Sequence, residues 1–148
     1  MIIPISWEEI HFIWQQHLWP NRISAIEPMS AMHRLGGYDI KNMESVPVFL
    51  GYISNNKIVG VNSGHACPND LTYRSRGLWV DPLFRGQGIG QALLTAVVKQ
   101  GQSEGYNTVW SYPRQTSWTT YQSVGFSLIG DWESSENSDA NAYCMATF

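Results

Sequence analysis

The chain has 148 residues, 43% of them hydrophobic, which is enough for one domain over residues 1–148 with a core of its own. A formal net charge of −3 argues against general binding to nucleic acid, and Cys67 and Cys144 are too few for a disulfide framework or a zinc ribbon. No apolar run reaches the length of a membrane span, and the first residues lack the pattern of a secretory signal. We therefore expect a cytoplasmic protein with free thiols and no membrane or nucleic-acid partner.

The first third of the chain predicts one strand and two helices. Residues 1–5 have a short strand pattern, and Ser6 with Glu9 makes a capping box that begins a helix running to about Leu18. After a loop, we expect a second helix over residues 29–35, closed by the glycine pair that follows it.

The remaining two thirds predict six strands and two more helices. Three antiparallel strands form a meander, a strand–helix crossover follows it, and two strands end the chain. The expected strands are 48–54, 58–64, 71–80, 108–112, 126–130 and 142–147, and the expected helices are 89–104 and 117–124. Residues 132–139 form a polar connection. This order predicts an α+β, or α/β, fold with a mixed, largely antiparallel central sheet of about seven strands and helices on both faces.

The segment VDPLFRGQGIGQALL, residues 80–94, places three glycines directly before an amphipathic helix. A helix N-terminus exposes unpaired N–H groups and carries partial positive charge, and glycines let a phosphate approach those groups closely. Arg85 adds a charge beside the loop, within a basic middle of the chain. The spacing fits neither a nucleotide P-loop nor a dinucleotide fingerprint. A structural turn is the alternative, but the strand before the loop and the helix after it favour a phosphate or pyrophosphate ligand.

The stretch LWVDPLFRGQGIG, residues 78–90, resembles the acetyl-CoA signature of the GNAT N-acetyltransferase superfamily. The family pattern Arg/Gln-x-x-Gly-x-Gly/Ala is met by Arg85, Gly88 and Gly90. A second family feature is a tyrosine four residues before a Gly-Phe pair, and Tyr121 matches it at the expected distance downstream. The order of predicted elements also resembles the GNAT order over nearly the whole chain.

This resemblance implies that acetyl-CoA is the acyl donor. The pyrophosphate would lie on the N–H groups of the glycine loop, and the pantetheine arm would add to residues 78–80 like a further strand. The thioester would lie where the sheet splays, between this strand and residues 109–112. The implied donor-binding residues are Leu78, Trp79, Val80, Arg85, Gly86, Gln87, Gly88, Ile89, Gly90, Arg114 and Ser117.

The family chemistry implied is direct attack of a primary amine on the thioester, without an acyl-enzyme. Tyr121 would protonate the departing thiolate, because a phenol with an ordinary pKa of about 10 keeps its proton at neutral pH. The backbone N–H near Val80 would stabilise the oxyanion. A core tyrosine is the alternative for Tyr121.

Two positions depart from the family pattern. Several relatives carry a Glu or His base on the strand before the signature, where this chain has Arg74 and Arg76, and a guanidinium cannot act as a base. Candidate bases elsewhere are Glu27, His65 and Asp70, with a chain of water molecules as the alternative. Relatives also often have Asn at the position of Arg114.

The acceptor pocket of this family is usually walled by the first two helices and the last strand pair. Three arginines near that wall would hold a carboxylate, so we expect a small primary amine that carries an anionic group, such as an amino acid. The candidate substrate residues are Trp19, Arg22, Glu27, His65, Arg74 and Arg76.

Two other functions stay open. The chain would acetylate a protein N-terminus or a lysine, since the acidic segment 131–139 suits a basic peptide, or it would bind CoA as a sensor without turnover. The missing base favours the sensor, whereas Tyr121 argues against it. The four histidines are not arranged as a metal site, and a homodimer is open because such folds often dimerise.

Overall fold

The computed structural model describes residues 1–135 and 138–148. A seven-stranded sheet forms its centre, in the order β1-β2-β3-β4-β5-β9-β6. The strands are β1 (Ile2–Pro4), β2 (Val48–Ser54), β3 (Lys57–Cys67), β4 (Thr72–Val80), β5 (Thr108–Ser111), β6 (Ser127–Leu128) and β9 (Cys144–Thr147). Only the β4–β5 pair of this sheet is parallel, so the predicted mixed, largely antiparallel sheet is confirmed.

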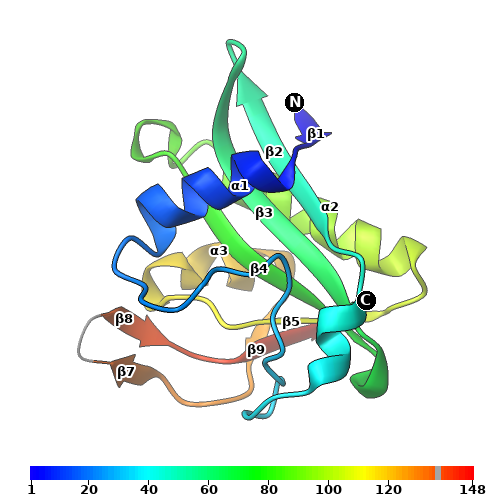
Figure 1. Cartoon of the computed structure of the whole chain (residues 1–148). Coiled ribbons are helices and arrows are strands. Elements are labelled where there is room, and N and C mark those ends of the chain that lie inside the picture. Colours follow the sequence, from blue (N-terminus) through cyan, green and yellow to red (C-terminus); the bar gives the residue numbers. More distant parts are fainter. Residues whose placement is uncertain (136–137) are drawn as a thin grey trace.

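Helices cover both faces of the sheet (Figure 1). On one face, α1 (Trp7–Ile13) begins at the predicted capping box and continues as the π-helix η1 (Trp14–Leu18). On the other face lie α2 (Ile89–Ser103) and α3 (Trp118–Val124). Short 3₁₀ turns are η2 (Ile40–Glu44), η3 (Pro68–Asp70), η4 (Pro82–Phe84) and η5 (Gln115–Ser117). No helix in the described part of the chain is both long enough and apolar enough to cross a bilayer.

Each face of the sheet has its own hydrophobic core. Leu93 and Val97 of α2 pack with Tyr73 of β4 on one face, and Trp14 packs with Trp79 on the other. Because side chains alternate along a strand, successive residues of β4 enter different cores. This alternation decides on which face each functional side chain of β4 lies.

A bulge in β4 changes its register against β3. Between the positions opposite Val61 and Ser63, β4 contains one residue more than β3, and Gly77 lies there with φ of +77°. The indole of Trp14 donates a 2.8 Å hydrogen bond to the Gly77 carbonyl. A Cβ atom at position 77 would overlap the Trp14 ring, so both the backbone conformation and the packing require glycine.

The two central strands, β4 and β5, pair only over a short stretch before they separate. Their register pairs are Tyr73 with Val109 and Arg74 with Trp110. The hydroxyl of Ser111 then lies 2.7 Å from the Ser75 carbonyl and satisfies it where the strand pairing ends. Beyond this point β4 continues to Val80 without β5, which confirms the predicted splay.

The predicted helix over residues 29–35 is wrong. This stretch forms turns with a single bridge between Met32 and Tyr38. The Ser30 N–H bonds to His65 at 3.4 Å, and the guanidinium of Arg34 bonds to Asp70 at 2.7 Å. A stretch this short has little helical stability of its own, and its contacts with the β3–β4 end decide its conformation.

The prediction of a plain connection over residues 132–139 is also wrong. A two-stranded antiparallel hairpin of β7 (Glu133–Ser135) and β8 (Ser138–Asn141) occupies most of this stretch. The two residues between these strands, 136 and 137, lie outside the described residues. Such polar strands give no apolar alternation from which the hairpin could be predicted.

Replacement of Gly77 by alanine tests the bulge. We expect Gly77→Ala to lower the free energy of unfolding by about 2 to 5 kcal/mol, because left-handed backbone strain adds to overlap with Trp14. Gly105→Ala is the control, since Gly105 also has positive φ but has no atom within 4 Å of an added Cβ, and it should cost about 1 to 2 kcal/mol. Equal losses in urea denaturation would reject the packing role of Gly77.

Candidate active site

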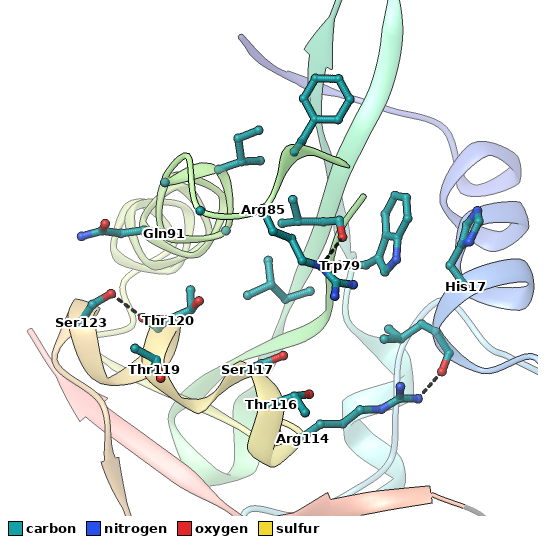
Figure 2. A pocket seen from close by; sticks show the side chains of 18 residues that line it. His17, Trp79, Arg85, Gln91, Arg114, Thr116, Ser117, Thr119, Thr120 and Ser123 are labelled. Carbon is teal, nitrogen blue, oxygen red and sulfur yellow. Dashed lines mark hydrogen bonds between the residues drawn. The ribbon is translucent and has the colours of Figure 1, made fainter. Parts of the chain in front are cut away.

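A cavity of about 440 Å³ runs along the free edge of β4, between η1 on one side and α2 with α3 on the other (Figure 2). The basic side chains in its lining are His17, Arg85 and Arg114, and none of its lining residues is acidic. Such a lining favours a negatively charged ligand. The cavity therefore has the charge expected for the site of a phosphate-bearing molecule.

The N-terminus of α2 closes one end of this cavity. The N-cap residue of the helix is Gly88, which has φ of +79°, and no side chain forms a capping hydrogen bond there. Its first intrahelical hydrogen bond runs from Ala92 N–H to the Gly88 carbonyl at 3.0 Å, so the N–H groups of residues 89–91 precede the ladder. An added Cβ at Gly90 would lie 3.4 Å from Thr120, which is an ordinary van der Waals contact, so α3 packs directly against the first turn of α2. The end of α2 is therefore shaped to receive an anion.

The edge of β4 presents unpaired backbone groups to the same cavity. The Asp81 N–H donates to the Val59 carbonyl at 2.8 Å, and Val80 lies opposite Gly60. Because hydrogen-bonded and non-bonded pairs alternate in an antiparallel ladder, the N–H and C=O of Val80 point away from β3, toward the splay. Arg85 Nε donates to that carbonyl at 3.0 Å, which leaves the Val80 N–H facing the gap.

A row of hydroxyl side chains lies on η5 and α3, across the cavity from His17 and Trp79 (Figure 2). These residues are Thr116, Ser117, Thr119, Thr120 and Ser123. Of this row, the sequence analysis identified only Ser117. A signal was nevertheless present, because positions 116, 119, 120 and 123 follow the spacing of one helical face. The row gives a bound ligand several donors and acceptors on one side.

A smaller cavity of about 60 Å³ passes through the fork between β4 and β5. Tyr121 lines it from the α3 side, and Arg74, Arg76 and Trp19 line it from the η1 side. It shares Leu18, Leu78, Arg114 and Ser117 with the larger cavity, so the two adjoin. Ser111 and Tyr112 of this lining belong to residues 109–112, which were expected to border the splay, whereas sequence reasoning did not anticipate Pro113 and Asn141.

Tyr121 lies at the fork, and two hydroxyl groups from the separating strands hold its phenol. Its oxygen is 3.2 Å from Ser111 Oγ of β5 and 3.5 Å from Ser75 Oγ of β4. Ser75 is held in turn by Asn62, whose amide donates to it at 3.0 Å. Burial raises the pKa of Tyr121 to about 12, although the hydrogen bonds from Ser111 and Ser75 oppose this effect. The phenol therefore stays protonated at neutral pH.

Two buried arginines lie on the η1 face of the fork and differ in their partners. Burial lowers the pKa of Arg76 to about 9 and that of Arg74 to about 10, so both stay charged at neutral pH. Arg76 donates to the Glu27 carbonyl at 2.6 Å. Arg74 lies over the Trp110 ring at 4.8 Å, but its Nε and Nη1 have no hydrogen-bond partner among the described residues. Because burying an ion costs several kcal/mol and a cation–π contact returns about 2 kcal/mol, Arg74 is undercompensated.

Arg114 connects the two cavities at their common wall. Its guanidinium donates to the Leu18 carbonyl at the end of η1, across the mouth of the splay (Figure 2). This contact joins the chain after β5 to the C-terminal end of η1, where a carbonyl would otherwise lack a partner. The predicted residue is thus at the site, but this hydrogen bond goes to the protein itself.

Several candidate residues lie outside both cavity linings: Arg22, Glu27, His65, Asp70 and Gln87. His65 is fully buried, accepts a hydrogen bond from Ser30 and has its pKa lowered to about 3, chiefly by burial. Asp70 accepts from Arg34 at the distant β3–β4 turn. This geometry gives none of the three candidate bases direct access to the fork.

The sequence profile of the acetyltransferase (GNAT) family matches residues 10–126. The chain belongs to the GNAT acetyltransferase family. This membership confirms the resemblance on which the site was predicted, and the enzyme class of the family is the acetyl-CoA-dependent N-acyltransferase. The matched range includes the glycine loop, β4 and Tyr121, which line the two cavities.

One relative acts on a protein, and two solved structures share the fold. Over 78 residues the chain is 37% identical to a [ribosomal protein bS18]-alanine N-acetyltransferase of Haemophilus ducreyi, and the match spans 48% of this chain and about half, 54%, of that relative. A GNAT acetyltransferase of Staphylococcus aureus shares the fold with a TM-score of 0.68 over 99% of this chain and 98% of its own, at 18% identity. The PaiA N-acetyltransferase of Thermoplasma acidophilum, solved in complex with coenzyme A, gives a TM-score of 0.56 over 69% and 61%, at 17% identity.

Within residues 1–135 and 138–148, no group of three or more His, Cys, Asp or Glu side chains lies close enough together to hold a metal ion. The lining of the two cavities supplies guanidinium, hydroxyl and backbone N–H groups instead, which suit the phosphates and the amides of coenzyme A.

Binding of coenzyme A tests the role of the glycine loop. We expect Gly88→Ala to weaken this binding roughly tenfold or more, because the change disturbs the N–H groups at the start of α2. Gly105→Ala at the other end of the helix has a comparable stability cost, but binding should be unchanged. Isothermal calorimetry with coenzyme A measures the affinity of both variants. Equal affinities would show that the phosphates do not bind at the N-terminus of α2.

Proposed function

We propose that this chain transfers the acetyl group of acetyl-CoA directly to a primary amine on a small molecule, one that also carries an anionic group. The observation that carries this proposal is the meeting of the two cavities at the fork, beside Tyr121. The larger cavity suits the donor and the smaller one the acceptor. The reacting groups would then meet between β4 and β5.

The backbone and the glycine loop support the position of the donor. The N–H groups at the start of α2 suit the pyrophosphate, and Arg85 and Arg114 add positive charge along the cavity. The free edge at Leu78–Val80 suits the amide groups of pantetheine, as in the addition of a strand to a sheet. Together these contacts would bring the thioester to the fork.

The chemistry proposed for the fork is a single acyl transfer. The neutral amine nitrogen attacks the thioester carbonyl carbon, and the Val80 N–H faces the gap where the oxyanion would form. The carbon–sulfur bond then breaks, and the sulfur takes the Tyr121 proton. The attacking nitrogen loses a proton to water, and a proton from solvent restores the phenol. The products are an N-acetylated amine and the free thiol of coenzyme A.

The size of the acceptor cavity supports a small acceptor. Residues 20–39, the cover segment, cross the η1 face and are held by Arg76 to the Glu27 carbonyl, by His65 to Ser30 and by Asp70 to Arg34. This segment does not line the smaller cavity, and the volume of that cavity, about 60 Å³, suits a small molecule rather than a peptide chain. No acidic residue lines this cavity, so nothing in its lining favours a polyamine.

A protein N-terminus is the second candidate acceptor. Its support is the 37% identity to the bS18-alanine N-acetyltransferase over the matched half of the chain. A CoA-binding sensor without turnover is a third, and its support is that none of the predicted bases Glu27, His65 and Asp70 lines either cavity. A cytoplasmic location and a homodimer stay predictions.

A panel of acceptors separates these functions. Release of thiol from acetyl-CoA is measured with amino acids, their amides, polyamines and peptides with a free N-terminus. We expect the amino acids to give the highest kcat/KM, because the lining of the acceptor cavity is cationic. Turnover with peptides alone would favour the protein acceptor, and CoA binding without any turnover would favour the sensor.

Replacement of Tyr121 by phenylalanine tests the proton donor. We expect Tyr121→Phe to lower kcat about 100-fold with unchanged CoA affinity, since only the hydroxyl is lost. Because the raised pKa of about 12 keeps the phenol protonated, the kcat of the wild type should not fall between about pH 8 and pH 10. Tyr73→Phe is the matched control, because Tyr73 is a buried tyrosine that bonds Glu104 and lines neither cavity. Similar rates for the two variants would reject the acid role.

A further inference from the structure

We propose, building on the acetyl transfer proposed above, that Arg74 alone binds a carboxylate of the acceptor. Arg74 lines the smaller cavity and is 6% exposed, and its Nε and Nη1 have no hydrogen-bond partner among the described residues. The charged groups that act on it are Arg22 and Arg76, which are both cations, and no carboxylate of the described residues forms a salt bridge with it. A buried guanidinium without an anion is costly, so the site has a place for one from outside.

The other two arginines of the predicted cluster are already engaged elsewhere. Arg76 donates to the Glu27 carbonyl, and its guanidinium lies 5.0 Å and 5.2 Å from the ring centroids of Trp14 and Trp19. Arg22 is exposed, bonds Ser24 at 3.0 Å and lines neither cavity. Arg76 therefore holds the cover segment. Of the three arginines that the sequence predicted to bind a carboxylate together, only Arg74 is left to bind one.

The position of Arg74 on β4 sets the orientation of the acceptor. It precedes Ser75, which contacts the Tyr121 phenol, but the alternation along the strand sends the two side chains to opposite faces. A carboxylate on Arg74 would thus lie on the η1 face, and an amine a short distance along the same molecule would reach into the fork. This geometry favours a compact molecule with its amine and carboxylate close together.

The chemistry of the guanidinium favours a carboxylate. Its Cζ lies 4.8 Å from the centroid of the Trp110 ring, and its Nε and Nη1 donors have no partner among the described residues. Two donors of one guanidinium can bind the two oxygens of a carboxylate in parallel. That carboxylate can belong to a free amino acid or to the acidic side chain of a peptide N-terminus, and the small volume of the cavity, about 60 Å³, favours the amino acid.

The test compares acid and amide forms of the same acceptor in wild type and in Arg74→Gln. We expect the variant to raise KM for an amino acid roughly 10- to 100-fold, with KM for its amide nearly unchanged. Arg74→Lys should restore part of the preference, because it keeps the charge but loses the paired donors. An equal effect of Arg74→Gln on acid and amide would overturn the proposal, and so would a wild-type enzyme with no preference between them.

Two further measurements keep this outcome separate from that of the proposed function. Arg74→Gln removes an uncompensated buried charge, so its thermal midpoint should not fall below that of wild type. Equilibrium binding of an N-acetylated amino acid against its amide, with coenzyme A present, reports on Arg74 without any turnover. If the wild type prefers the acid and the variant does not, the carboxylate site stands even where no amine is acetylated. Peptides with N-terminal Asp or Glu, if bound better than free amino acids, would overturn the assignment to a small molecule.

Discussion

The early separation of β4 from β5 is the constraint on which the rest of the site depends. The strands share two register pairs, and the bulge at Gly77 then turns β4 away while the Trp14 indole holds the bulge carbonyl. A strand that loses its neighbour has backbone N–H and C=O groups without partners, which is normally a cost. Here the exposed edge lines a cavity, so a ligand that can pair like a strand satisfies it.

This separation also makes one site out of two faces of the sheet. The α2–α3 face supplies the helix N-terminus, a row of hydroxyl groups and Tyr121, and the η1 face supplies Arg74 and Arg76. In a fully paired sheet these groups would be kept apart by a continuous layer of backbone. Through the fork, a proton donor on one face and a cation on the other lie around the same small cavity.

The stability of the sheet and its chemistry place opposite demands on β4. Its first residues are fully paired and buried, whereas its last residues leave one side free. Arg74 lies on β4 between its fully paired residues and its residues with one free side, and it is charged and buried without an anion. Such a residue lowers stability, and retention of an uncompensated charge is typical of a binding position rather than of a structural one.

The sequence by itself determined the order of most elements, the capped first helix and the glycine loop before α2, because these follow from local periodicity, capping and turn chemistry, and the resemblance of its motifs to the GNAT family implied that Tyr121 lies at the fork. It could not determine the conformation of residues 29–35, the β7–β8 hairpin or which arginine is free. Those depend on contacts between distant segments, such as Ser30 with His65 and Arg76 with the Glu27 carbonyl. Tertiary structure alone decided them, since a hydrogen bond between residues far apart in the chain leaves no trace in local spacing.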